Sequence, residues 1–321
     1  MYNSIQYKTK QFFYFLIKLA IVFGAFYFIY NKILHNEQIQ FKEFIIQLET
    51  VVFKNFSTIW ILLGFTIANW YFEILKWKTL TSALKNISFF DSLQQSLGSL
   101  TASLFTPNRI GEYGAKAIYF HKGTRRKVLL LNLLGNMMQM TTTILFGTIG
   151  LVYLFNHFDV DITFDQIRKP MFFLALFLLL IFIVSGNGYR KIRGFYIEQV
   201  IDFDKKLSLK IHLKNGGYSI ARYLIFSHQF YFLLNVFNVN TDYITSMSLI
   251  SSMYLLASII PGLALLDWLI KGSVAILVFS LIGINELIIV TITLLMWLCN
   301  FGLPALIGSY FVLNFNFPNQ K

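Results

Sequence analysis

Charged side chains are scarce in this chain, making up 13% of its 321 residues. A soluble domain carries about 25% charged and about 45–50% apolar residues, because its surface must be covered by polar groups. Here 56% of the residues are hydrophobic and the mean hydropathy is +0.61. This composition excludes an ordinary soluble domain and indicates an integral membrane protein.

The sequence has a single cysteine and lacks the common catalytic motifs. The one cysteine, Cys299, lies in an apolar run, so a disulfide framework or a cysteine-based metal site is excluded and a packed thiol is expected. The five histidines are scattered, and the sequence contains no His-Glu-x-x-His, Walker A loop or Gly-x-Ser-x-Gly elbow. We therefore expect no catalytic residue, no metal and no cofactor.

Apolar runs near the about 20 residues that cross a hydrocarbon core recur along the chain. Two others, 92–106 and 245–262, are rich in small residues and are interrupted by proline, so they do not fit as simple spans. The fold class predicted is an all-α integral membrane protein with about seven transmembrane helices and two re-entrant, proline-broken segments. Simple spans are expected at 12–30, 57–75, 128–155, 170–185, 218–236, 272–285 and 287–313.

The net charge of +12 is not evidence of a nucleic-acid partner, because the positive charges cluster in loops between the expected spans. Of the 27 lysines and arginines, 18 lie in residues 1–11, 76–127 and 186–217, whereas the alternate connections 31–56 and 156–169 hold five. The positive-inside rule then places the amino terminus in the cytoplasm. The location expected is the cell inner membrane, crossed several times.

Two segments of the chain resemble each other. The first is "SLGSLTASLFTPNRIGEYGAK" (96–116) and the second is "SLISSMYLLASIIPGLALLDWLIK" (248–271). Each has a small-residue stretch, then Ala-Ser, a proline, an acidic residue and a lysine four residues after the acid. The first would enter from the cytoplasm and the second from outside. Broken segments in corresponding positions of two inverted halves point to a transporter's binding site, although a chance likeness remains the alternative.

This likeness divides a single polytopic domain, 1–321, into two halves. The first half covers about 57–185 and the second about 218–313. Residues 186–217 between them are partly amphipathic and are expected to connect the halves on the cytoplasmic membrane surface.

The residues around the two breaks suggest a site for a lipid head group. Arg109 follows Pro107 at the expected start of a helix, where free N–H groups favour anions, and its planar fork suits phosphate. Gly111 would let the backbone approach a ligand closely. Ionisable groups at membrane depth are costly unless they are paired or solvated, so the acids would line a polar path; the alternative is a plain ion pair at a helix end. The candidate head-group residues are Arg109, Gly111, Glu112, Lys116, Asp267 and Lys271, and the breaks are Pro107, Pro261 and Gly262.

A basic cluster follows the first break. Its residues would face the inner leaflet, where each charge contributes about 1 kcal/mol against an anionic surface. A cluster of this kind sets topology more often than it recognises a ligand. Its members are Lys122, Arg125, Arg126 and Lys127.

With these residues in place, "LFTPNRIGEYGAKAIYF" resembles the Pro-x-x-(aliphatic)-Gly-Glu signature of the flippase-like proteins that share the transmembrane region of lysylphosphatidylglycerol synthases. "SIIPGLALLDWLIKGSVAI" is similar to the second signature of that family, but Leu263 stands where a second glycine is usual and Asp267 replaces a glutamate. The likeness covers about residues 12–313. The sequence shows no soluble synthase domain, so synthesis of aminoacyl lipids is not expected.

The resemblance implies a protein that moves, or helps to move, an anionic or polyprenyl-phosphate-linked lipid between leaflets. The alternative is an integral membrane lipid-modifying enzyme or a non-catalytic partner of an envelope-lipid enzyme. An enzyme should gather acids at one depth of the membrane, and this chain has only 15 acids, mostly outside the apolar segments. Whether the protein forms a homo-oligomer or binds an envelope enzyme is left open.

Overall fold

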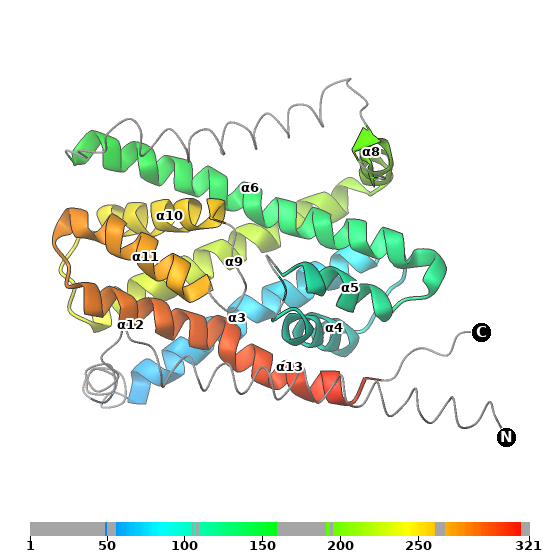
Figure 1. The fold of residues 1–321 in the computed structure, drawn as a ribbon, viewed down its shortest axis with the longest axis horizontal. Helices are drawn as coiled ribbons and strands as arrows, with labels where there is room; N and C mark the ends of the chain where they lie inside the picture. The colour runs from blue at the N-terminus through cyan, green and yellow to red at the C-terminus, as the bar shows by residue number, and fades with distance from the viewer. Residues whose placement is uncertain are drawn as a thin grey trace.

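The computed structural model describes residues 49, 56–104, 106, 109–158, 191–192, 195–260 and 267–315, and almost all of them are helical (Figure 1). The α-helices are α3 (Phe56–Thr81), α4 (Phe89–Ala102), α5 (Ile110–Ile118), α6 (Arg125–His157), α8 (Ile197–Lys205), α9 (Leu209–Val236), α10 (Tyr243–Ile259), α11 (Asp267–Phe279), α12 (Glu286–Trp297) and α13 (Leu303–Leu313). The remaining elements are the 3-10 turns η2 (Lys122–Thr124) and η4 (Ser280–Ile282), the π-helix η5 (Leu298–Gly302), and the antiparallel strands β1 (Lys191–Ile192) and β2 (Phe195–Tyr196).

Three helical stretches within the described residues are long and apolar enough to cross a membrane. They are α3, η2 with α6, and the continuous run of α12, η5 and α13. They confirm the helices expected at 57–75, 128–155 and 287–313. Helix α9 has 28 residues and contains the segment expected at 218–236. The runs expected at 12–30 and 170–185 lie outside the described residues.

Two pairs of shorter helices form hairpins in which the chain turns back. Figure 1 shows α4 and α5 at one end of the long helices and α10 and α11 at the other. The segment expected to span the membrane at 272–285 lies instead in α11 and η4. Because α11 has 13 residues, it is only about 20 Å long, and it returns the chain toward the end where α10 begins.

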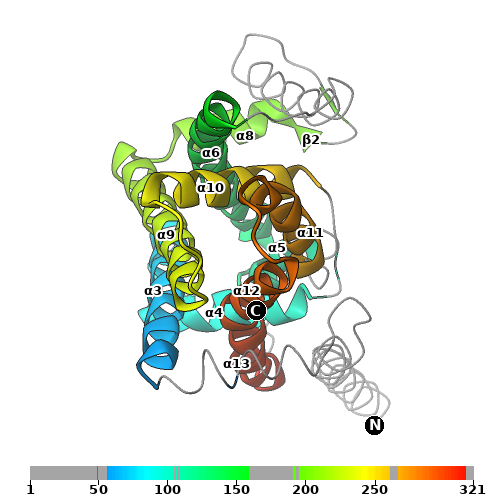
Figure 2. The ribbon, with the colours of Figure 1, turned by 90° about the vertical axis from the view of Figure 1, so that its left-hand side faces the viewer.

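The packing of one half of the chain is repeated in the other. Helix α3 packs along α9, and each hairpin lies against the long helix of the opposite half: α10 against α6, and α4 against α13. Figure 2 shows these helices arranged around the centre of the molecule.

Glycines allow the two hairpin contacts to be close. A Cβ atom added at Gly308 of α13 would lie 2.7 Å from the Leu97 carbonyl carbon of α4, and one at Gly150 of α6 would lie 2.7 Å from the Ser248 carbonyl oxygen of α10. Thr101 of α4 donates a hydrogen bond to the Ala305 carbonyl of α13 at 2.7 Å. The backbones of α4 and α13, and those of α10 and α6, are therefore in close contact without large side chains between them.

Side-chain caps define where the inward arm of each hairpin begins. Helix α4 starts with a capping box, in which the Ser88 hydroxyl accepts from the Asp91 N–H and the Asp91 carboxylate accepts from the Ser88 N–H. At α10, the Asp242 carboxylate accepts from the Thr245 N–H at 2.9 Å, and this bond holds the pKa of Asp242 below its usual value. Both arms thus begin at a polar cap.

The described residues of the connector expected at 186–217 form several short elements. The connector contains β1 and β2, then α8, and α9 already begins within it at Leu209. Part of α9 therefore extends beyond the apolar segment 218–236.

Candidate functional site

Arg109 occupies the turn between the two arms of the first hairpin. It is the N-cap of α5 and has φ of 58°, a left-handed conformation that is uncommon for a residue with a side chain and costs about 1–2 kcal/mol. The expected helix start is confirmed, while Pro107 lies outside the described residues. Such strained positions persist where the surrounding structure holds them, often at binding sites.

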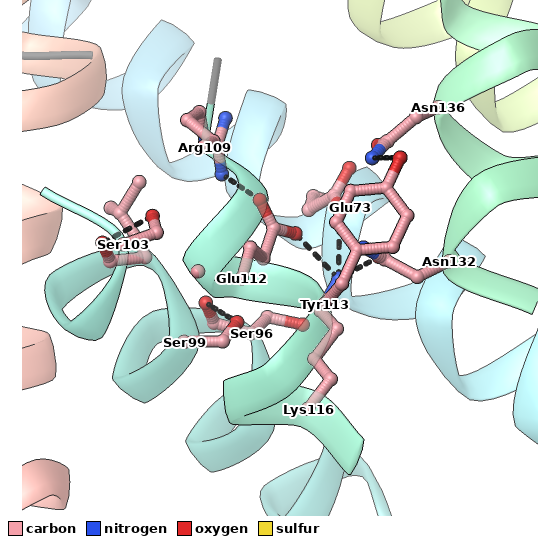
Figure 3. Close-up of polar contacts among 12 residues, drawn as sticks. Glu73, Ser96, Ser99, Ser103, Arg109, Glu112, Tyr113, Lys116, Asn132 and Asn136 are labelled. Atoms are coloured by element: carbon pink, nitrogen blue, oxygen red, sulfur yellow. Dashed lines mark hydrogen bonds and ion pairs between the residues drawn. The ribbon is translucent and has the colours of Figure 1, made fainter. Parts of the chain in front are cut away.

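Glu112 lies between two cations on the inner face of α5, as Figure 3 shows. Its carboxylate is 2.6 Å from Arg109 Nη2 and 2.7 Å from Lys116 Nζ. The Glu112 and Lys116 side chains are 5% and 2% exposed, but Arg109 is 40% exposed. The i,i+4 pair predicted from the sequence therefore forms, and Arg109 is its solvent-facing end.

Glu73 of α3 connects this pair to the second half of the chain. Its carboxylate is 2.8 Å from Lys76 Nζ and 3.9 Å from Lys116 Nζ, and it pairs directly with Arg222 of α9. We call the continuous run from Arg109 through Glu112, Lys116 and Glu73 to Arg222, with Lys76 beside it, the charge ladder.

A chain of side-chain amides continues from the ladder to the π-helix η5. Arg222 Nε donates to the Asn69 amide oxygen at 3.1 Å, Asn69 donates to Asn300 at 2.8 Å, and Asn300 donates to Gln229 at 2.7 Å. Gln229 then donates to the Leu62 carbonyl at 3.2 Å. Each amide is fixed in one orientation by its neighbours.

Pro304 accounts for the π-helix η5, through which this row of amides passes. Proline has no N–H and its ring clashes with the carbonyl four residues earlier, here that of Asn300. The freed Asn300 carbonyl accepts a hydrogen bond from Trp70 Nε1 of α3 at 3.1 Å. The helical run therefore contains a π-helix just before Pro304, a form that is frequent at functional sites.

The ladder is tightly packed around Lys116. Lys116 Nζ lies 4.3 Å from the centre of the Trp77 ring and donates to Asn132 at 2.9 Å. Trp77 and the side chains around it form a separate buried cluster, which we call the floor: Trp77, Leu80, Ala117, Phe120, Val128 and Leu131.

A cavity of about 400 Å³ lies on the opposite side of the ladder from the floor. Its size falls within the range of small-molecule sites. Arg109 and Arg222 line it, as do the tips of α10 and α11 and the residues around η5. Among the described residues, two buried donors at this cavity have no hydrogen-bond partner, Arg109 Nε and Trp297 Nε1.

The charges around this cavity do not balance. The ladder holds four cations, Lys76, Arg109, Lys116 and Arg222, against the two carboxylates of Glu73 and Glu112, which leaves an excess of two positive charges among the described residues. Such an excess in a low-dielectric interior favours an anionic ligand.

The candidate pair on the second hairpin also forms and also lines the cavity. Lys271 Nζ is 2.6 Å from the Asp267 carboxylate, with side chains 39% and 42% exposed. The structure thus brings Arg109, Asp267 and Lys271 to one cavity. Pro261 and Gly262 lie outside the described residues.

Three groups of candidate residues have other positions. Lys116 is a buried member of the ladder and does not line the cavity. Gly111 packs against the turn between α4 and α5 and not against the cavity, because a Cβ atom added there would lie 2.8 Å from Thr106 Cγ2. The basic cluster lies at the α4–α5 end of the molecule, and its members are exposed or half-buried: Lys122, Arg125, Arg126 and Lys127.

Sequence reasoning missed the centre of the ladder. Glu73 and Arg222 lie within expected spans, and an ionisable residue there is a functional candidate by default. Residues 76–127 contain nine lysines and arginines, and three of them, Lys76, Arg109 and Lys116, are part of the ladder. The other six positive residues of 76–127 are not part of the ladder. The segments expected in the cytoplasm therefore still hold more positive charges than the alternate connections 31–56 and 156–169.

The fold and this cavity are those of a helical membrane protein with a polar site between two broken hairpins. The chain belongs to the family described as Lysylphosphatidylglycerol synthase TM region, which it matches over residues 15–308. No curated protein and no solved structure matches it.

Proposed function

We propose that this protein is a flippase-like transporter that moves an anionic or polyprenyl-phosphate-linked lipid between the leaflets of the cell inner membrane. The observation that carries the proposal is the cavity between the two hairpin tips, lined by Arg109 and Arg222 and bordered by an excess of positive charge. The family is consistent with a lipid-related role in the membrane.

The head group proposed is a phosphate. Arginine offers a planar fork that matches phosphate oxygens, and two arginines from different helices converge on this cavity. The unpartnered Arg109 Nε and Trp297 Nε1 would supply further donors. Apolar and aromatic side chains of α9 and α10 line the rest of the cavity and would contact the lipid beyond its phosphate: Phe226, Phe230, Met253 and Tyr254.

The repeated packing supports an inverted repeat with two re-entrant hairpins. In this arrangement α4–α5 enters from the cytoplasm and α10–α11 from outside, so that both tips meet near the middle of the membrane, where transporters of this type bind their substrates. The charge asymmetry supports a cytoplasmic amino terminus.

The acids near the cavity support transport more than catalysis. Glu73 and Glu112 are buried in ion pairs, and Asp267 is paired with Lys271. In this proposal they position cations and the protein is not an enzyme.

Translocation of fluorescent lipids by purified protein in liposomes tests this function. Wild-type protein should move fluorescent phosphatidylglycerol or phosphatidic acid across the bilayer and leave phosphatidylcholine largely in place. Arg222→Lys should lower the rate about 10–100-fold, because lysine cannot keep both the Asn69 and Glu73 contacts and each charged hydrogen bond contributes about 1.5–3 kcal/mol.

Arg126→Gln is the matched control, because Arg126 is exposed on the basic cluster away from the cavity. It should translocate like wild type. Equal leaflet distributions with wild-type protein and with empty liposomes, for every anionic lipid tried, would contradict the proposed function.

A further inference from the structure

The two hairpins carry equivalent ion pairs in unequal environments. On α5 the Glu112 and Lys116 side chains are 5% and 2% exposed, whereas on α11 those of Asp267 and Lys271 are 42% and 39% exposed. Both pairs have the same i,i+4 spacing and lie on the second arm of a hairpin. The cavity is therefore accessible beside α11 and closed beside α5.

The charge ladder is the layer that closes it. On α3 the cavity is lined by Asn69 and Trp70. From Glu73 to the end of α3, no residue lines the cavity. Beyond Glu73, the side chains of Lys76 and Trp77 are buried at 3% and 1% exposure. The cavity thus ends where Arg222 meets Glu73, and the floor lies behind that layer.

The charges of the ladder divide into a balanced set and two remaining cations. Lys76 and Lys116 both contact Glu73, and Lys116 also contacts Glu112, so two lysines accompany two carboxylates. The two arginines are the remaining charges, and they are the members that line the cavity. An anion that took both arginines would leave the buried part of the ladder neutral.

We propose that Glu73 is a gate residue that competes with the phosphate of the ligand for Arg222. In the closed state Glu73 holds Arg222 and so joins α3 to α9 across the cavity's end, while Glu112 holds Arg109 at the start of α5. When a phosphate binds the two arginines, the carboxylates of Glu73 and Glu112 keep only Lys76 of α3 and Lys116 of α5 as partners. The ion pair between α3 and α9 is then lost, and the layer between the cavity and the floor opens.

This inference rests on the proposed function for its ligand, but its test does not require transport. Ser96 of α4 is 2% exposed and is drawn beside the ladder in Figure 3, so a cysteine there should react with a water-soluble maleimide only when the gate opens. The native Cys299 is first replaced by serine. The protein is placed in nanodiscs of phosphatidylcholine, with or without phosphatidic acid, and the labelling rate is measured.

Ser252 offers a matched control position on α10. Like Ser96 it is buried, and its hydroxyl also has no hydrogen-bond partner among the described residues, but it contacts α6 at Gly150 and is remote from the ladder. Labelling at Ser252→Cys should be slow in every lipid and every variant. A parallel rise at both positions would mean general loosening and would overturn the gate.

With Glu73 intact, phosphatidic acid should accelerate labelling at Ser96→Cys about tenfold over phosphatidylcholine alone, since the anion replaces charge-assisted contacts. Glu73→Gln should label fast in both lipids. Inorganic phosphate added to phosphatidylcholine nanodiscs separates a free anion from a lipid head group as the trigger. Either trigger supports competition for Arg222.

Labelling that is equally slow with and without phosphatidic acid or phosphate, or that is unchanged by Glu73→Gln, would overturn the proposal. If Glu73→Gln fails to fold, Glu112→Gln weakens the same layer from α5 and should show the same acceleration. A protein that labels as expected but moves no lipid would contradict the proposed function and leave the gate standing.

Discussion

Replacing Glu73 with alanine should lower the free energy of unfolding by about 3–5 kcal/mol, the cost of leaving buried charges without their partner. Three cations, Lys76, Lys116 and Arg222, lie against this one carboxylate, and the Lys76 and Lys116 side chains are 3% and 2% exposed. No other described carboxylate contacts Lys76 or Arg222. Unfolding in increasing concentrations of a denaturing detergent, followed by helical circular dichroism, measures the change.

Glu286→Ala is the matched control for this loss. Glu286 is also a glutamate on a helix, but it is exposed in the first turn of α12, where an acid contributes about 0.3–1 kcal/mol through the helix dipole. Equal effects of the two substitutions would mean that the ladder does not hold the fold together.

A methyl group added at Gly308 should destabilise the protein by about 1–3 kcal/mol, the usual cost of overpacking. The new Cβ would lie 2.7 Å from the Leu97 carbonyl carbon, and a backbone carbonyl cannot swing away as a flexible side chain can. The helices α4 and α13 would separate, and the hydrogen bond from Thr101 to Ala305 would lengthen. Thermal unfolding of Gly308→Ala in nanodiscs checks this.

Gly64→Ala is the control for the change in helix propensity. Gly64 lies within α3, and a Cβ atom there meets nothing within 4 Å. The substitution should be neutral or should stabilise α3 by up to about 1 kcal/mol. If Gly308→Ala were as harmless as Gly64→Ala, the close seating of the first hairpin would be contradicted.

Much of this fold follows from local patterns in the sequence. The apolar runs locate the long helices because only hydrocarbon-length runs satisfy the backbone inside a bilayer. The breaks near Arg109 and Asp267, each with a lysine four residues after an acid, predicted the Glu112–Lys116 and Asp267–Lys271 ion pairs. A turn and an i,i+4 spacing on one helix are short-range features, so a single sequence is enough to reveal them.

The centre of the site depends on contacts that no local pattern encodes. Glu73 and Arg222 are 149 residues apart, and their pairing arises only because α3 packs along α9. The sequence also could not tell that Lys116 is buried over Trp77 while Lys271 is partly exposed, because the two lysines occupy equivalent positions in similar segments. The difference in burial between the two lysines arises from how the two hairpins pack and not from the local sequence.

The most direct test of the account is to block the cavity and follow the lipid. A cysteine at Ser258, an exposed residue that lines the cavity, is introduced after Cys299→Ser and is modified with a bulky reagent through a disulfide. A cysteine at Ser82, exposed outside the cavity, serves as the control. We expect that modification at 258 stops translocation of fluorescent phosphatidic acid, that reduction restores it, and that modification at 82 has no effect. Undiminished translocation through the blocked protein would contradict the claim that the lipid head group passes through this cavity.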